Sequence, residues 1–363
     1  MTIYLDYQAT TPLAPEAFDA MVPLLRDQFA NPHSAHRLGR AAAAQVELAR
    51  EQVISLLPEG GRLVFTSGAT EALNMAISGT ADGEIVTLAT EHAAVLDTVA
   101  AVGAKGRSTT VLPVGSDGLV DLNVAEAAIK PGVKLVTAML VNNEIGVIQP
   151  VEELANLAHR AGALLLCDAV QGYGRVAIPA NCDMVAISGH KIHGPKGVGA
   201  LWLREGVTLD PIMHGGGQEA GLRSGTLSPA LCAGFGIAAK LMRKRAQQDH
   251  SHVEALWDQA RDLFSGWTLN GNASARYHGN LNIRRDGIDG ARLLSDCRNV
   301  AFSLGSACAS GSGRPSHVLR AIGLSDRQAR GSVRIGVGRY TTPADLESAA
   351  KMMNEAAAIQ AAP

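Results

Sequence analysis

The chain of 363 residues is too long for one small domain and fits two domains, or a large domain with a smaller one. Its 32 basic and 34 acidic side chains give a net charge of -2, which excludes the basic footprint of proteins that bind nucleic acids or anionic membranes. Asp6 interrupts the N-terminus before an apolar stretch develops, and no apolar run approaches the roughly 20 residues of a membrane span. We therefore expect a cytoplasmic protein.

Apolar runs and helical stretches alternate from Arg62 to Leu203, a pattern typical of a mostly parallel sheet covered on both faces by helices. Strands are predicted at residues 63–65, 85–88, 110–114, 134–141, 163–167, 184–187 and 198–203. Helices are predicted at residues 40–57, 71–77, 93–102, 122–129 and 151–160. The expected fold class is α/β, built on a mostly parallel seven-stranded sheet.

The pattern changes after Ser228. A long helical region at 229–264 precedes short predicted strands at 280–283, 300–302 and 333–337 and a closing helix at 344–359. We interpret this part as a smaller α+β domain to which the first dozen residues return. The predicted division is a large cofactor-binding domain at 13–250 and a small domain at 1–12 and 251–363, which carries the segment around Cys308.

An aspartate and a lysine follow two neighbouring predicted strands. Asp168 comes directly after the strand at 163–167, and Lys191 follows the strand at 184–187. Because ligands of open α/β sheets bind beyond the carboxyl ends of the strands, both side chains can converge on one small aromatic cofactor. Lysine forms a Schiff base with an aldehyde and aspartate pairs with a protonated ring nitrogen, the combination that pyridoxal phosphate requires. Most lysines after strands are only solvated, so the prediction depends on the neighbouring motifs.

Three further motifs follow predicted strands. Residues 67–71, Ser-Gly-Ala-Thr-Glu, open a helix whose free N–H groups, with the Thr70 hydroxyl, suit a phosphate, although an ordinary helix cap is the simpler interpretation. His92 follows the next strand and is a candidate for stacking on a ring and moving protons. Asn143 ends a third strand, and Gln171 lies three residues beyond Asp168. Four such loops form a plausible single site.

The cysteines and histidines predict no metal centre. Five cysteines without a C-x-x-C pair make a disulfide framework or a structural zinc site unsupported. His190, His193 and His214 have no carboxylate or thiolate partners at metal-ligand spacing. Cys308 differs from the other cysteines because it lies among glycine and serine, where a solvent-accessible thiol is either a nucleophile or an incidental loop residue.

Together these segments resemble the fold-type I, class V pyridoxal phosphate enzymes, and most closely the cysteine desulfurases that serve iron–sulfur cluster assembly and nitrogen fixation. The resemblance covers nearly the whole chain. The motifs that carry it are YLDYQATTP at 4–12, NPHS at 31–34, FTSGATE at 65–71, TEH at 90–92, VNNEIG at 141–146, DAVQ at 168–171, SGHK at 188–191, GGGQE at 215–219, RSGT at 223–226, GSAC at 305–308 and SVRIGVGR at 332–339.

The resemblance implies a role for each matched residue. Lys191 is the Schiff-base lysine and proton carrier, Asp168 keeps the ring nitrogen protonated, Gln171 bonds the ring oxygen and His92 stacks on the ring. The phosphate is held by Ala69, Thr70, Ser188 and His190, and by Thr226 from the second subunit of a homodimer. Asn143 and Arg334 hold the substrate carboxylate, with Arg339 as the weaker candidate. Cys308 accepts the sulfur of L-cysteine as a persulfide and passes it to an acceptor protein, such as an iron–sulfur scaffold or a sulfur carrier.

Two other functions remain open at this point. A selenocysteine lyase or cysteine sulfinate desulfinase shares the fold and the cofactor. A non-catalytic relative that acts as a binding protein is the alternative of a different class, although the presence of Lys191, Asp168, His92 and Cys308 argues against it.

Overall fold

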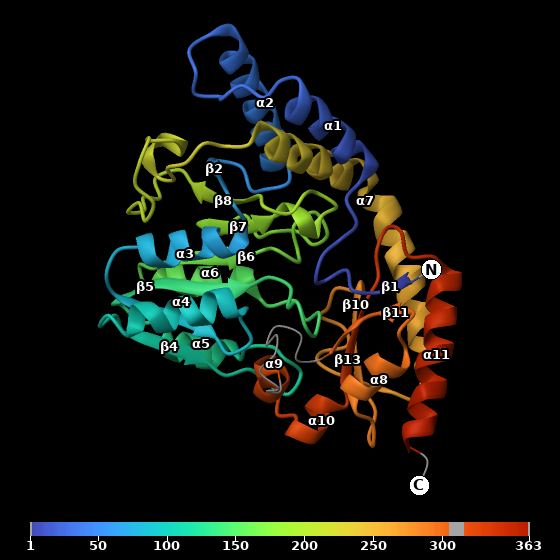
Figure 1. The fold of residues 1–363 in the computed structure, drawn as a ribbon. Coiled ribbons are helices and arrows are strands. Elements are labelled where there is room, and N and C mark those ends of the chain that lie inside the picture. Colours follow the sequence, from blue (N-terminus) through green and yellow to red (C-terminus); the bar gives the residue numbers. More distant parts are fainter. Residues whose placement is uncertain (1, 305–315, 362–363) are drawn as a thin grey trace.

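The structure, a computed structural model, describes residues 2–304 and 316–361 (Figure 1). Within these residues, seven strands form the central sheet in the order β2-β8-β7-β6-β5-β3-β4. Their bounds are β2 Gly61–Thr66, β3 Glu84–Leu88, β4 Thr109–Leu112, β5 Val133–Met139, β6 Leu164–Asp168, β7 Met184–Ser188 and β8 Gly199–Arg204. Only β8 runs antiparallel to its neighbours β2 and β7. The mostly parallel seven-stranded α/β sheet expected from the sequence is confirmed.

Helices cover both faces of this sheet. The helices α3 (Ala69–Gly79) and α4 (Ala93–Gly103) lie on one face. The other face is covered by α2 (Arg37–Ile54), α5 (Leu122–Ala128), α6 (Val151–Arg160) and part of α7 (Pro229–Leu263). Successive residues of β7 alternate between the two cores, with Met184 and Ala186 in one and Val185 and Ile187 in the other. Such strands are buried on both faces and therefore appear in the sequence as continuous apolar runs.

A second, smaller sheet lies beside the first (Figure 1). It has the order β12-β13-β10-β9, and a separate parallel pair joins β1 to β11. The bounds of these elements are β1 Ile3–Tyr4, β9 Thr268–Leu269, β10 Asn280–Arg284, β11 Val300–Ala301, β12 Ser303–Leu304 and β13 Ser332–Gly336. The strand predicted at 300–302 is present as the shorter β11, because the chain leaves this pairing at buried Phe302 and enters a different one, which was not predicted, as β12.

Helices complete the part of the chain around this sheet. They are α8 (Gly290–Asp296), α9 (His317–Ala321), α10 (Asp326–Arg330) and α11 (Pro343–Ala361). An apolar core of its own joins α7, α8 and α11 to β10 and β13. The helix α7 continues unbroken through residue 250, running from the large sheet to α11 (Figure 1). The division of the chain at 250 therefore stays a prediction, and one continuous helix passes through it.

The sequence did not predict α1 (Pro15–Arg26), which packs against α7. Only Ala17, Met21 and Leu24 of this helix are buried, so its apolar stripe is narrow. None of the helices in the described ranges is long and apolar enough to cross a membrane.

Candidate active site

A cavity of about 580 Å³ lies at the carboxyl edge of the large sheet, where that edge faces β12 and β13 of the small sheet. The loops after β2, β3, β5, β6 and β7 all contribute to its wall, as expected for an open α/β sheet. Ten of the residues predicted from the sequence line it: Ala69, Thr70, His92, Asn143, Asp168, Gln171, Ser188, His190, Lys191 and Arg334. Residues separated by more than 260 positions along the chain thus meet in one place.

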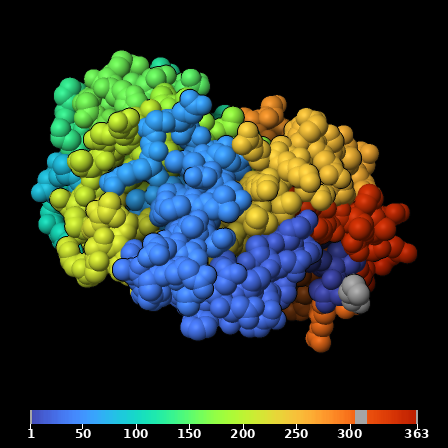
Figure 2. Space-filling view, turned by 90° about the horizontal axis from the view of Figure 1, so that it is seen from above, coloured from blue at the N-terminus to red at the C-terminus, as the bar shows by residue number. Residues whose placement is uncertain are grey.

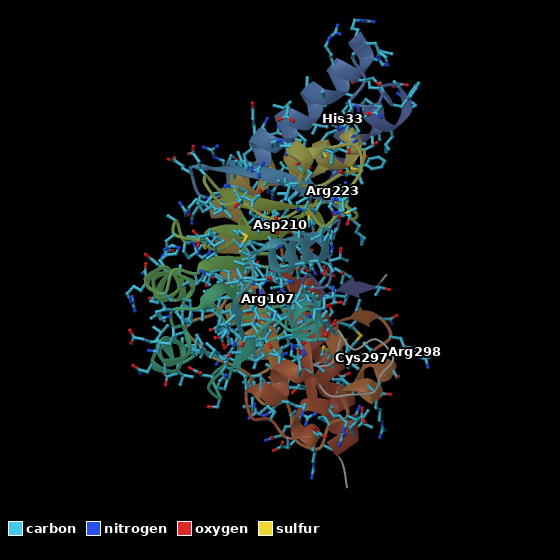
Figure 3. The ribbon with its side chains drawn as sticks, turned by 90° about the vertical axis from the view of Figure 1, so that its left-hand side faces the viewer. His33, Arg107, Asp210, Arg223, Cys297 and Arg298 are labelled. Carbon is cyan, nitrogen blue, oxygen red and sulfur yellow. The ribbon has the colours of Figure 1, made fainter. Side chains whose placement is uncertain are left out.

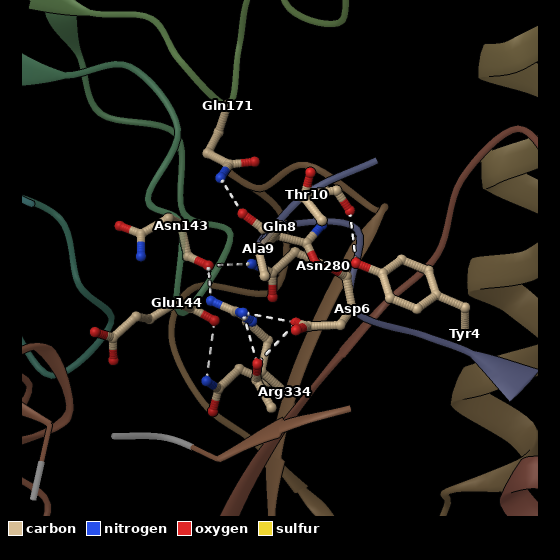
Figure 4. Close-up of polar contacts among 12 residues, drawn as sticks. Tyr4, Asp6, Gln8, Ala9, Thr10, Asn143, Glu144, Gln171, Asn280 and Arg334 are labelled. Carbon is tan, nitrogen blue, oxygen red and sulfur yellow. Dashed lines mark hydrogen bonds and ion pairs between the residues drawn. The ribbon is translucent and has the colours of Figure 1, made fainter. Parts of the chain in front are cut away.

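The N-terminal segment at 6–11 holds the lysine of this cavity. Lys191 ends the short helix η1 (Gly189–Lys191), and its Nζ donates hydrogen bonds to the carbonyl oxygens of Gln8 at 2.6 Å and Ala9 at 2.8 Å. The Nε2 of Gln171 donates to the same Gln8 oxygen at 2.9 Å (Figure 4). Thr11 accepts from His193 N and donates to His190 O, which fastens the segment to both ends of the lysine turn. The lysine amine is thus fixed in space by backbone carbonyls.

One end of the cavity is suited to an anion. The helix α3 begins there with Gly68 at its N-cap and no side chain capping its first N–H groups, which leaves them available to a phosphate. A Cβ on Gly199 would approach the Cα of Gly68 to 2.7 Å, so β8 requires glycine to pass this loop. His190 lies at the same end with its Nδ1 3.1 Å from Thr10 Oγ1, and burial together with Lys191 and Lys196 lowers its pKa to about 4. His190 is therefore a neutral hydrogen-bonding group at pH 7.

Asp168 and His92 also line the cavity, and both are titratable. Burial raises the pKa of the Asp168 carboxyl, while the hydrogen bond from Val170 N and the nearby His92 and Lys191 oppose this rise. Burial likewise lowers the pKa of His92. Because Ala94 N donates to His92 Nδ1 at 3.0 Å, the proton of the neutral ring sits on Nε2. The structure thus fixes which nitrogen of His92 carries the proton.

Arg334 supplies the cation on the opposite wall. It lies on β13, and its guanidinium is buried. Its Nη1 donates to Asn143 O at 3.0 Å, and its Nη2 donates to Asp6 Oδ1 at 2.8 Å and Ser303 Oγ at 2.9 Å (Figure 4). Arg339, the weaker sequence candidate, lies elsewhere and pairs with Asp249 at 2.6 Å. Arg334 is therefore the arginine that can meet a carboxylate in this cavity.

One predicted residue that the structure describes, Thr226, does not line the cavity. Thr226 is exposed on the loop between β8 and α7, and the ion pair of Arg223 with Glu71 at 2.6 Å fastens this loop to α3. Figure 3 shows Arg223 in the half of the molecule opposite Cys297 and Arg298. Cys308 lies outside the residues that the structure describes.

Several polar groups of the cavity were not predicted from the sequence. Asp6, Gln8 and Ala9 line the cavity and lie in the YLDYQATTP motif at 4–12, for whose residues the resemblance implies no role. Backbone carbonyls such as those of Gln8 and Ala9 leave no mark on residue type, whereas an acid at position 6, before an otherwise neutral ATTP stretch, was a usable signal.

Glu91 is a second missed group. Its side chain is fully buried, Oε1 accepts a hydrogen bond from Met139 N at 2.6 Å, and Oε2 has no hydrogen-bond partner among the described residues. Met139 pairs with Asp168 across β5 and β6, so the Glu91 carboxyl lies behind the aspartate of the cavity. Burial, with the charge of Asp168, raises the pKa of Glu91 to about 8, and the acid is therefore neutral at pH 7.

Comparison with known proteins shows a family and relatives that match nearly the whole chain. The family described as "Aminotransferase class-V" matches residues 3–348. The cysteine desulfurase IscS of Rickettsia bellii is 41% identical, over 97% of this chain and 90% of that protein. A probable mitochondrial cysteine desulfurase of Dictyostelium discoideum is 42% identical, over 95% of this chain and 80% of its own length.

Solved structures agree with this placement. A NifS-like protein superposes with a TM-score of 0.91 at 31% identity, covering 99% of this chain and all of the other. The protein described as SspA in complex with cysteine superposes with a TM-score of 0.84 at 34% identity and covers 94% of this chain. The similarity in fold and the similarity in sequence therefore point to the same family.

Replacement of Glu91 by glutamine tests the buried acid. Because the folded protein holds this proton up to a pKa of about 8 while an exposed glutamate loses it near 4.5, the contribution of Glu91 to stability falls as pH rises through this window. Glu91→Gln cannot ionise, so its free energy of unfolding should lack this fall, which amounts to about 4 kcal/mol between pH 5 and pH 8.5 in the wild type. Urea unfolding at both pH values measures the difference, with Glu126→Gln on the exposed face of α5 as the control. Equal pH dependence in the wild type and Glu91→Gln would contradict the assignment.

Proposed function

The chain belongs to the class-V aminotransferase family, and from this premise we propose that it is a cysteine desulfurase, which removes the sulfur of L-cysteine and leaves L-alanine. The observation that carries the proposal is the convergence of ten motif residues on one cavity in a chain whose relatives bear that name. The structural relative solved with cysteine supports an amino-acid substrate of this size.

The residues of the cavity fit pyridoxal 5'-phosphate. The uncapped start of α3, with Ala69, Thr70, Ser188 and His190, offers donors for the phosphate. Asp168 is a buried carboxyl with one backbone hydrogen bond from the described residues, and a protonated ring nitrogen would give it a matched partner. When bound, the cofactor supplies an aldehyde that condenses with amines and a ring that accepts electrons from the substrate.

The chain's own residues position the substrate and move the protons. Arg334 and the Asn143 side chain hold the carboxylate through charge-assisted hydrogen bonds. Lys191, released from the carbonyls of Gln8 and Ala9, takes the α-proton of the substrate. With the cofactor bound, His92 would cover its ring, with the imidazole proton on Nε2 because Ala94 N donates to Nδ1. Gln171, whose amide donates to Gln8 O, would bond the ring oxygen.

Cys308 completes the reaction. Its thiolate forms a bond to the sulfur of the substrate while the carbon–sulfur bond breaks, and the electron pair of that bond stays with the carbon, which takes a proton to become the methyl group of alanine. The sulfur remains on Cys308 as a persulfide until an acceptor protein, such as an iron–sulfur scaffold or a sulfur carrier, takes it. This role rests on the family motif, since Cys308 lies outside the described residues. A cytoplasmic location stays a prediction.

The protein acts as a homodimer in this proposal. Large apolar side chains are exposed on and between α1 and α2, which lie side by side on the face shown in Figure 2. They are Phe18, Leu25, Phe29, Leu38 and Leu48, with exposed fractions from 48% to 78%. Such a patch is typical of a subunit interface. In this proposal Thr226, which is exposed and does not line its own cavity, serves the phosphate end of the second subunit.

Replacement of Cys308 by alanine tests the reaction. Without the nucleophile, release of sulfur from L-cysteine should fall at least about 100-fold. Cleavage of selenocysteine, which does not need the thiol, should persist and serves as the internal control for folding and cofactor loading. Alanine is measured from both substrates, together with sulfide from L-cysteine and selenide from selenocysteine. Unchanged turnover of L-cysteine would contradict the mechanism and favour the selenocysteine lyase alternative.

Mixed dimers test the origin of Thr226. Thr226→Val removes a phosphate donor, so the homodimer should need about tenfold more cofactor for half-saturation. In a mixed dimer with a Lys191→Ala subunit, the one working site takes its Thr226 from the Lys191→Ala partner, and its half-saturation should return to the wild-type value. Thr226→Ser is the matched control that keeps the hydroxyl. If the mixed dimer stays as impaired as the Thr226→Val homodimer, the threonine serves its own subunit.

A further inference from the structure

Arg334, the arginine proposed to bind the carboxylate of the substrate, already pairs with a carboxylate of the protein, that of Asp6. Asp6 lines the cavity, and its Oδ1 accepts hydrogen bonds from Arg334 Nη2 and Ser303 Oγ, each at 2.8 Å (Figure 4). This oxygen has two donors, and the three groups form a closed triangle because Ser303 Oγ also accepts from Arg334 Nη2 at 2.9 Å. The arginine therefore presents little net positive charge to the cavity.

Arg334 nevertheless keeps donors for a ligand. Its hydrogen bonds to Asn143 O, Asp6 and Ser303 use three of the five N–H groups of a guanidinium. Nε has no hydrogen-bond partner among the described residues, although it is buried. A substrate carboxylate can thus join the arginine without displacing Asp6, and the two carboxylates then share one cation.

The second carboxylate oxygen of Asp6, Oδ2, can accept a hydrogen bond from the ammonium group of an amino acid. Within the described ranges, Oδ2 accepts no hydrogen bond, and the Asp6 side chain is 19% exposed. The backbone behind it is held in place, because Tyr4 Oη donates to Asp6 O at 3.2 Å and Thr10 O at 2.8 Å, and Asp6 pairs with Gly336 of β13. A fixed carboxylate oxygen beside an arginine matches the two charges of an amino acid, with the carboxylate on Arg334 and the ammonium on Asp6.

We propose that Asp6 is a specificity-determining residue that makes the cavity select amino-acid zwitterions over simple carboxylates. The inference rests on the proposed function and adds a residue to its substrate site. A ligand that carries only a carboxylate is repelled by the negative charge of Asp6, since it has no positive group to pair with it. A zwitterion places its carboxylate on Arg334 and its ammonium on Asp6, so both charges are paired. An arginine without this aspartate would bind any small carboxylate and admit unreactive metabolites to the site.

The test compares two ligands that differ only in the amino group, L-alanine and propanoate. In cofactor-loaded, borohydride-reduced protein the cofactor stays fixed to Lys191, so both ligands bind without covalent chemistry. Ligand-observed NMR titration should show that wild-type protein prefers L-alanine about tenfold, the worth of one charge-assisted hydrogen bond. Asp6→Asn keeps the shape and the acceptor for Arg334 but removes the charge, so it should bind propanoate more tightly and reduce the preference to about twofold or less.

A matched control is Asp296→Asn, which removes the acid of the exposed Arg292–Asp296 pair on α8 and should leave the preference unchanged. The wild-type measurement needs no variant and already tests the inference, since equal binding of both ligands overturns it. An unchanged tenfold preference in folded Asp6→Asn also overturns it and leaves the desulfurase proposal standing. A cofactor that borohydride does not fix to Lys191 counts instead against the proposed function and removes the basis of the inference.

Discussion

The site depends on one constraint, the insertion of the N-terminal segment at 6–11 between the large and the small sheet. Its backbone carbonyls fix the Lys191 amine and the Gln171 amide, its Asp6 side chain binds Arg334, and Thr11 fastens it to the lysine turn. Gln8 also donates to Gly279 O, next to β10. A single short segment, with a turn at residues 7–9, thus contacts groups carried by both sheets.

The polar groups around the cavity occupy defined protonation states because burial and hydrogen bonds act together. His92 and His190 are neutral, and Glu91 holds a proton behind Asp168 at pH 7. Burying several charged groups at one sheet edge would cost far more than hydrogen bonds return. The two histidines and Glu91 therefore add no charge beside Lys191, Asp168, Asp6 and Arg334.

The sequence predicted the large sheet well, because strands buried on both faces are continuous apolar runs and their carboxyl ends must share an edge. It predicted the small domain less well, since β11 and β12 are two residues each and change partner at Phe302. The site residues with a distinctive side chain were found by motif. The carbonyls of Gln8 and Ala9 and the pairing of Asp6 with Arg334 depend on tertiary contacts across more than 180 residues and could not be read from local pattern.

The central claim is that sulfur passes from L-cysteine to Cys308. The most direct measurement is mass spectrometry of the protein after L-cysteine is added and thiols are trapped by alkylation. The account predicts one additional sulfur atom on the peptide that contains Cys308, formed together with alanine, and none on the peptides of the buried Cys167, Cys182, Cys232 and Cys297. Formation of alanine without an added sulfur on Cys308 would contradict it.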